Sequence, residues 1–281
     1  MKRAGIIIIV MLGVSVWCFG QGNDKPASNP PTGQAAAAPQ GKRPPAAKTQ
    51  PEFDAYKAAA ALPDPAAQEK AADDFAAKFA DSELRAVLYK VVMHGYQQAN
   101  NADKMMEMGR KVLGSDADDP EALVGVAQVL AERTRETDLD KDQRLAEAKK
   151  DAERSLVTVD TDIPTANVPQ DKLDAYKGFL RSEAYVILGT LAFNAKDWPE
   201  AETNLRKSID ALPQQPDPVA VLRLAIVLDS EKKYPEALKY ANQAVDLTKE
   251  GTAAGKAARD ERDRLTQLNS GTAPGQNPAP K

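Results

Sequence analysis

Residues 182–213 contain two runs of apolar residues at the spacing of an α-helix, separated by the sequence KDWP at 196–199. This pattern predicts two short antiparallel helices. Gly189 lies in the first run and Ala201 in the second, and we expect the helices to approach closely at these small residues. Larger side chains such as Leu205 would then interdigitate around them. The stretch indicates helix packing and shows no pattern typical of a catalytic site.

The same helix start occurs a second time. The sequence WPEA at 198–201 is repeated as YPEA at 234–237. A sequence that recurs after 36 residues, from 198 to 234, indicates tandem supersecondary units. Asp197 and Glu200 also have the spacing of a capping box, in which each residue accepts a hydrogen bond from the other's backbone amide.

These residues resemble the tetratricopeptide repeat, whose pattern is W-x2-L-G-x2-Y, then A-x3-F, then P over about 34 residues. The matching positions are Tyr185, Leu188 and Gly189 in the first helix, Ala201 and Leu205 in the second, and Pro213 after it. Ala192 departs from the pattern, which has a tyrosine there. The resemblance implies an all-α fold, an α-solenoid of about five helical hairpins with a C-terminal capping helix.

The solenoid is expected to span residues 51–269, because helical patterns follow one another there without a β pattern. The expected hairpins are 51–81, 82–117, 119–159, 170–213 and 217–249, and the cap is 252–268. A charged insertion at 134–142 should lengthen a helix or form an exposed loop. A helix beginning near Gln170 should be longer than the standard repeat. Stacked hairpins share one core and leave a curved groove.

The two ends of the chain have different compositions from the solenoid. Residues 1–20 have the charged start and short apolar run of a signal peptide, with cleavage after Gly20. An uncleaved segment would instead tether the protein to the membrane. Cys18 raises a lipoprotein alternative, which Trp17 disfavours. Residues 21–50, rich in proline and alanine, and residues 270–281 are expected to be a disordered linker and tail. The protein is thus expected to be exported, as a periplasmic, envelope-associated or extracellular protein.

Few residue types suited to catalysis or cofactor binding are present. The formal net charge is −4, which argues against nucleic acid as a partner. Cys18 and His94 are the single cysteine and histidine, so histidine-based zinc sites are excluded, as is a Cys–His dyad once the signal peptide is removed. No glycine-rich phosphate loop occurs. We therefore expect no cofactor and no enzymatic activity.

One acidic motif resembles part of a calcium-binding loop. Asp138, Asp140 and Asp142 have the spacing that opens a calcium-binding loop. However, Gln143 stands in place of the required glycine and Lys149 in place of the final glutamate. We expect a solvated charged insertion and no metal site.

The resemblance implies that the inward positions of the first helices form a protein-binding groove. These positions are Lys90, His94, Gln97, Glu121, Val124, Gln128, Glu183, Val186, Thr190, Phe193, Asn194, Leu222, Ile226 and Asp229. They predict a groove that is polar toward its N-terminal end and apolar toward its C-terminal end. Phe193 is either an exposed binding hot spot or packs against Ile226 between hairpins. His94 either contributes to binding or is simply an exposed polar residue.

The expected function is that of a non-catalytic scaffold of the bacterial cell envelope that binds a peptide or another protein. Residues 71–84 also resemble repeats of envelope lipoproteins, which suggests a component of outer-membrane or cell-wall assembly as an alternative. A cell-wall hydrolase is a further alternative, because acidic residues are abundant. Hairpins could also stack end to end between molecules.

Overall fold

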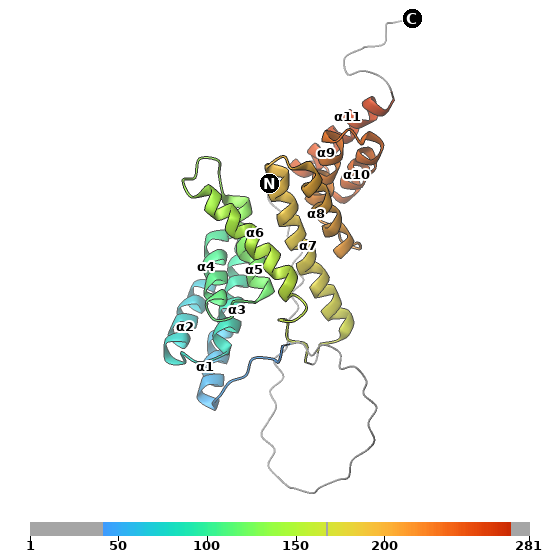
Figure 1. Cartoon of the computed structure of the whole chain (residues 1–281). Coiled ribbons are helices and arrows are strands. Elements are labelled where there is room, and N and C mark those ends of the chain that lie inside the picture. Colours follow the sequence, from blue (N-terminus) through green and yellow to red (C-terminus); the bar gives the residue numbers. More distant parts are fainter. Residues whose placement is uncertain (1–41, 167, 271–281) are drawn as a thin grey trace, which may run out of the picture.

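The computed structural model describes residues 42–166 and 168–270, where it contains eleven α-helices and no strand (Figure 1). The helices are α1 (Gln50–Ala60), α2 (Pro65–Lys78), α3 (Leu84–Gln98), α4 (Ala102–Leu113), α5 (Pro120–Arg133), α6 (Lys141–Thr158), α7 (Gln170–Asn194), α8 (Trp198–Ala211), α9 (Pro218–Ser230), α10 (Tyr234–Leu247) and α11 (Ala253–Asn269). They form five hairpins and a final helix, which confirms the predicted all-α solenoid with a capping helix.

Successive hairpins stack side by side. Each first helix packs on its own second helix, and α5 and α9 also contact α7 directly. In Figure 1 the helices α1–α6 lie on one side of α7 and α8–α11 lie on the other. The predicted signal peptide, the linker as far as residue 41 and the tail from residue 271 lie outside the described residues. Within those residues, no helix combines the length and apolar content needed to cross a membrane.

Aspartate followed by proline starts several of the helices. The side chains of Asp64, Asp119 and Asp217 each accept a hydrogen bond from a backbone amide in the first turn of the helix that follows. Asp197 does the same for Glu200 at 3.2 Å. The Glu200 carboxylate, however, pairs with Lys149 on α6 at 3.1 Å. Half of the predicted capping box is therefore present, and its other half instead links two hairpins.

The close approach of α7 and α8 is centred on Gly189 and Leu205. A Cβ atom added to Gly189 would lie 2.8 Å from Leu205 Cγ, which is closer than real contacts allow. Leu205 and Ala201 are both fully buried in the same apolar cluster. The glycine thus leaves the space that the leucine fills, as the sequence pattern predicts.

The length of α7 and the insertion in the third hairpin were both subjects of a prediction from the sequence. Helix α7 begins at Gln170 and has 25 residues, so the predicted long helix is confirmed. The insertion in the third hairpin forms a loop between Arg133 and Lys141 and does not lengthen α5. Leu139 is fully exposed in this loop.

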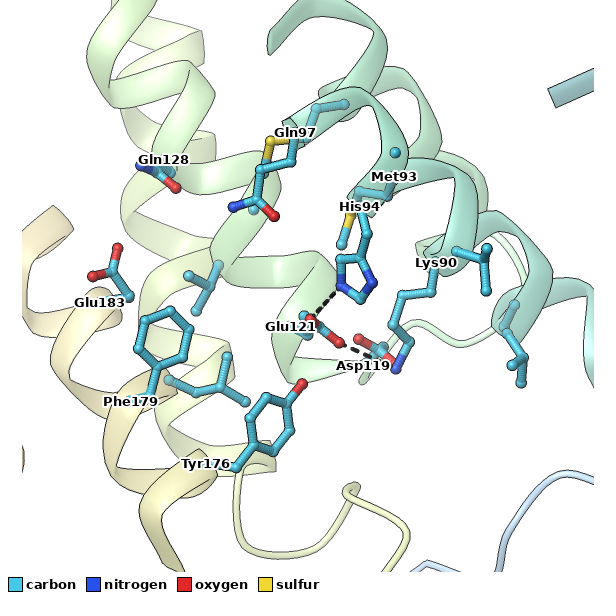
Figure 2. Close-up of a pocket in the computed structure, with 18 of the residues that line it drawn as sticks. Lys90, Met93, His94, Gln97, Asp119, Glu121, Gln128, Tyr176, Phe179 and Glu183 are labelled. Atoms are coloured by element: carbon cyan, nitrogen blue, oxygen red, sulfur yellow. Dashed lines mark hydrogen bonds and ion pairs between the residues drawn. The ribbon is translucent and has the colours of Figure 1, made fainter. Parts of the chain in front are cut away.

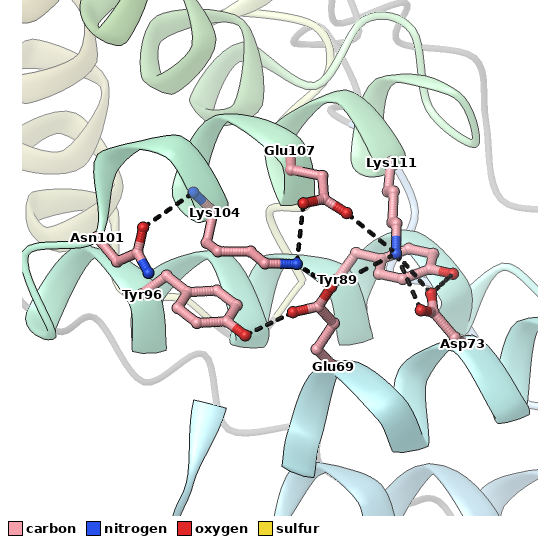
Figure 3. A network of polar contacts seen from close by, with 8 residues as sticks. All are labelled: Glu69, Asp73, Tyr89, Tyr96, Asn101, Lys104, Glu107 and Lys111. Carbon is pink, nitrogen blue, oxygen red and sulfur yellow. Dashed lines mark hydrogen bonds and ion pairs between the residues drawn. The ribbon is translucent and has the colours of Figure 1, made fainter. Parts of the chain in front are cut away.

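The first hairpin is joined to the second by polar contacts outside the core (Figure 3). Lys104 lies 2.8 Å from Glu69, which also accepts a hydrogen bond from the Tyr96 hydroxyl. The Tyr89 hydroxyl donates to Asp73 at 2.9 Å, and burial together with this bond raises the pKa of Tyr89 to about 12. The first hairpin matches the repeat pattern weakly, and these contacts fix its position on α3 and α4.

The N-terminal boundary of the ordered region differs from the prediction. Helix α1 begins at Gln50, and residues 42–49, which we call the strap, lie against the solenoid. Ala47 packs against the core cluster of the first two hairpins. The expectation of a disordered linker is therefore wrong for residues 42–50. It was based on the scarcity of large apolar side chains, whereas the strap is held mainly by ion pairs and hydrogen bonds.

Three hairpins turn through a residue with a left-handed backbone. Lys196 and Lys232 have φ angles of 58° and 62° at equivalent positions, just after the first helix of their hairpins. This region is unfavourable for a residue with a Cβ atom. We expect Lys196→Gly to raise the free energy of unfolding by about 0.5–1 kcal/mol, measured by urea denaturation. Lys150→Gly, within α6, should lower it by about 1 kcal/mol; a loss at position 196 would contradict the backbone argument.

Candidate functional site

A concave groove lies between α3, α5 and α7 (Figure 2). Its mouth is lined by the strap, and the loop before α9 contributes residues 214–217. The structure brings together on this surface a large part of the predicted set, namely Lys90, His94, Gln97, Glu121, Val124, Gln128, Glu183, Thr190 and Asn194. Val124 lines it with little of its surface exposed, because most of its side chain belongs to the core.

Charged side chains from α3 and the start of α5 meet at the centre of the groove. Lys90 Nζ lies 2.5 Å from Asp119 Oδ2 and 3.6 Å from Glu121 Oε2. His94 Nε2 lies 2.6 Å from Glu121 Oε1. Asp119 is the N-cap of α5, and Glu121 is in its first turn, where the helix dipole favours negative charge. The beginning of one helix therefore supplies both carboxylates, and the facing helix supplies both nitrogen groups.

These contacts hold the charged forms of the groups. Burial alone would raise the pKa of Glu121, but the hydrogen bond with His94 and the charge of Lys90 outweigh it and lower the pKa to about 2. Burial would lower the pKa of His94, whereas its hydrogen bond to Glu121 and the charge of that carboxylate raise it. The pKa of Lys90 is raised by Asp119 and Glu121, which outweigh its burial. Around neutral pH, Lys90 and Glu121 are thus held as a pair of opposite charges at the groove centre.

Three residues of the site were missed by sequence reasoning. Asp119 precedes Pro120, a pattern that indicates only a helix cap, and Tyr176 has a helical spacing from Leu173 and Leu180 that indicates only a buried position. Tyr176 is half-buried, lines the groove and helps to lower the pKa of Glu121. Phe179, one turn further along α7, lines the same wall (Figure 2). Their spacing at i and i+3 in the extension of α7 was the available signal, because it places both rings on one face.

Comparison with known proteins was informative at the level of structure. No family model and no curated protein matches the chain. The solved structure of PilF from Pseudomonas aeruginosa aligns with a TM-score of 0.51 and 17% identity, over 81% of this chain and 96% of that one. PilF is a protein of the tetratricopeptide-repeat type.

The chain has a tetratricopeptide-repeat fold. At this identity the likeness to PilF concerns the fold alone. The structure of MamA aligns with a TM-score of 0.41 and 18% identity over 66% of this chain and 89% of that one. Acl4, described as an assembly chaperone of RpL4, aligns with a TM-score of 0.39 and 13% identity over 78% of this chain and 97% of that one.

Two of the predicted groove residues are instead buried between repeats. Val186 has no exposed surface and belongs to the cluster that joins α7 to α9. Leu222 is buried in the cluster beneath α11. In a tetratricopeptide-repeat solenoid the first helices of adjacent hairpins pack on one another, so some inward positions are used by the neighbouring helix.

Phe193 is not an exposed hot spot. Its ring packs edge-on against Trp198 with 5.7 Å between ring centroids, in the turn from α7 to α8. Ile226 belongs to a different cluster, which includes Ala257 of α11. The alternative expectation, that Phe193 and Ile226 pack on each other, stays a prediction.

The capping helix α11 covers the C-terminal end of the predicted groove. It packs on α9 and α10. Asp229 forms an ion pair with Arg264 of α11 at 2.5 Å. The helix occupies the place of a sixth hairpin and covers the inward face of α9. The predicted apolar half of the groove is thus closed, and the groove lies mainly along α3, α5 and α7.

Thr190 connects α7 and α9 at the inner end of the groove. Its hydroxyl donates to the Val186 carbonyl at 2.7 Å and accepts from Arg223 Nη1 at 2.9 Å. Thr190 is buried, whereas Arg223 lines the groove. Thr190 therefore orients the arginine, and it is the arginine that a bound partner would meet.

The acidic insertion shows no arrangement typical of a metal site. Among residues 42–166 and 168–270, no three or more histidine, cysteine, aspartate or glutamate side chains are placed to hold a metal ion. Asp138 accepts a hydrogen bond from the Arg135 amide, and Asp140 lies 3.9 Å from Arg144. These aspartates thus organise the loop and the start of α6.

Proposed function

We propose that this chain is a non-catalytic protein-binding scaffold of the bacterial cell envelope, and that its groove holds a peptide or an extended segment of a partner protein. The observation that carries the proposal is the groove along α3, α5 and α7, with paired charges at its centre and polar side chains along its length. A solenoid presents such a surface without the enclosed pocket typical of enzymes.

The chemistry of the groove centre favours binding over catalysis. A general acid or base works best with a pKa near the working pH. The pKa of Glu121 is about 2, so this carboxylate is a weak base at neutral pH. Lys90 is held charged between two carboxylates. Such fixed charges can orient a charged or polar partner but are poorly suited to proton transfer.

The surroundings of the charges suit an extended chain. Gln97 and Asn194 are exposed and Gln128 is half-buried, so their amides can donate to and accept from a peptide backbone. Tyr176 and Phe179 offer ring surface on another part of the same groove, along the first half of α7 (Figure 2). Peptide-binding grooves commonly combine polar groups that hydrogen-bond to the peptide backbone with aromatic residues that anchor its side chains.

The envelope part of the proposal is supported by the sequence of residues 1–20, which has the features of a signal peptide. Fractionation of cells that produce the full chain should place it in the periplasmic or membrane fraction. A wholly cytoplasmic protein would contradict the envelope location and leave the binding proposal intact.

Site-specific crosslinking in cells tests the binding proposal. We expect a photo-crosslinking amino acid at Gln97 or at Gln128 to capture the same partner, because both residues line the groove. Gln143, which is exposed on α6 outside this groove, is the matched control and should capture much less of it. Equal capture at all three positions, or capture only at Gln143, would overturn the assignment of the groove.

A further inference from the structure

The strap, residues 42–49, runs across the mouth of the groove. It joins α1 from the side of the loop between α6 and α7 (Figure 1). It adopts no helix before residue 50 and lines the groove from Lys42 to Thr49. A segment of this chain therefore already occupies part of the surface that a partner would use.

Lys42 holds one end of the strap. Its Nζ atom lies 2.5 Å from Asp116 Oδ2 and 3.6 Å from Asp162 Oδ1. Its backbone amide donates to the Thr161 carbonyl at 3.2 Å. The acceptors come from the turn between α4 and α5 and from the loop between α6 and α7, so this lysine links two hairpins.

Arg43 and Ala46 hold the next part. The Arg43 guanidinium forms a two-pronged ion pair with Glu83, with 2.9 Å between Nη1 and Oε2. The Ala46 amide donates to the same carboxylate at 3.3 Å. The Glu83 carboxylate thus binds both a basic side chain and a backbone amide of an extended segment.

The attachment is weak in energetic terms. The Arg43 side chain is 69% exposed and that of Glu83 is 40% exposed, and exposed ion pairs of this kind contribute little to stability. Pro45 and Ala47 are only half-buried, so the apolar contribution is small as well. Residues 42–46 can therefore leave while the Lys48 amide and the Thr49 side chain still hold the start of α1.

Departure of the strap would change the charge of the groove mouth. Asp116 and Asp162 would lose Lys42, and Asp116 acts together with Asp119 and Glu121 on the charge of Lys90. The exposed strip would be strongly acidic and would attract a new cation. A basic, extended, proline-containing segment, similar to residues 42–46, is the ligand that fits its acceptors.

We propose that the strap is an autoinhibitory contact, which occupies the strip where a basic, extended segment of the partner docks until that segment displaces it. The inference rests on the proposed function of the groove and specifies the class of partner. Its test uses the chain's own segment as the probe and therefore does not depend on having identified the partner.

The experiment compares the full-length chain with the full-length double variant K42E/R43E. The probe is an acetylated peptide of residues 42–49, and binding is followed by chemical shifts in nuclear magnetic resonance. The variant should bind the peptide saturably and at least about tenfold more tightly than the unchanged chain, whose own strap competes at high effective concentration. Hydrogen exchange of the Ala46 amide should also be about tenfold faster in the variant.

Two controls make the result specific. The variant K150E/K256E has the same change in charge at exposed sites on α6 and α11 and should behave like the unchanged chain. Adding E83R/D116K to K42E/R43E should abolish peptide binding. Equal peptide binding by the unchanged chain and K42E/R43E, or no binding to K42E/R43E, would overturn the inference. Neither result would change the outcome of the crosslinking test. The two experiments therefore distinguish a failure of the autoinhibition proposal from a failure of the proposed binding groove.

Discussion

Replacement of Leu205 by alanine should lower the free energy of unfolding by about 2–5 kcal/mol, measured by chemical denaturation. Leu205 is fully buried and fills the space beside Gly189 between α7 and α8. Its removal leaves a cavity in the cluster that joins the fourth and fifth hairpins. The loss should appear as a shift of the midpoint with a similar slope.

The reciprocal change gives a sharper test of the same contact. Gly189→Ala should destabilise the protein by about 1–3 kcal/mol, because the new Cβ atom would lie 2.8 Å from Leu205 Cγ. In the Leu205→Ala background, the added methyl group enters vacated space and should cost much less. Additive effects of the two changes would contradict direct contact. Gly114→Ala is the control, since its Cβ would meet neighbours at an ordinary 3.5 Å.

The second large effect is expected at Glu121. Glu121→Ala should lower the free energy of unfolding by about 2 kcal/mol at pH 7, because Lys90 and His94 lose their shared partner. Glu121→Gln should lose less, since it keeps hydrogen-bonding atoms. No loss for Glu121→Ala would show that the charged centre is not coupled to folding.

The same contact predicts two opposite pH dependences. The pKa of Glu121 in the folded chain is about 2, below its usual range, so its stabilisation is present above about pH 4.5 and is lost as the pH falls toward 2. The pKa of His94 is raised, so its stabilisation is full below about pH 6.5 and is lost as the pH rises through the folded pKa.

Variants separate these two contributions. In stability measurements from about pH 2 to about pH 9, the range over which both groups titrate, Glu121→Gln should weaken both dependences. His94→Gln should remove the part above neutral pH and also reduce the acid part, because the hydrogen bond with His94 is the largest contribution that lowers the pKa of Glu121. Asp246→Asn, an exposed change on α10, should alter neither. A His94→Gln profile identical to that of the unchanged chain would contradict the contact between His94 and Glu121.

The helical hairpins were predictable because their signals are local. Asp-Pro pairs at 64, 119 and 217 each start a helix, since the aspartate caps it and the proline fixes its first residue. The long α7 was predictable for a similar reason, because its apolar positions continue from Gln170 at helical spacing.

The groove was predictable only in part. Lys90, His94 and Glu121 were assigned from the repeat register, and the structure brings them into contact. The same register assigned Leu222 to the groove, yet that residue is buried beneath α11. A helical register states the direction of a side chain, but what covers that side chain depends on another part of the chain.

By itself, the sequence determined the repeated hairpins, the starts of several helices and the tight packing of Gly189, because capping, periodicity and residue size act over a few residues. The tertiary structure alone decided that the strap docks through Lys42 and Arg43 on acids distant in sequence. It also decided that α11 closes one end of the groove. The physical reason is that burial and charge pairing depend on distances in space, which local patterns do not contain.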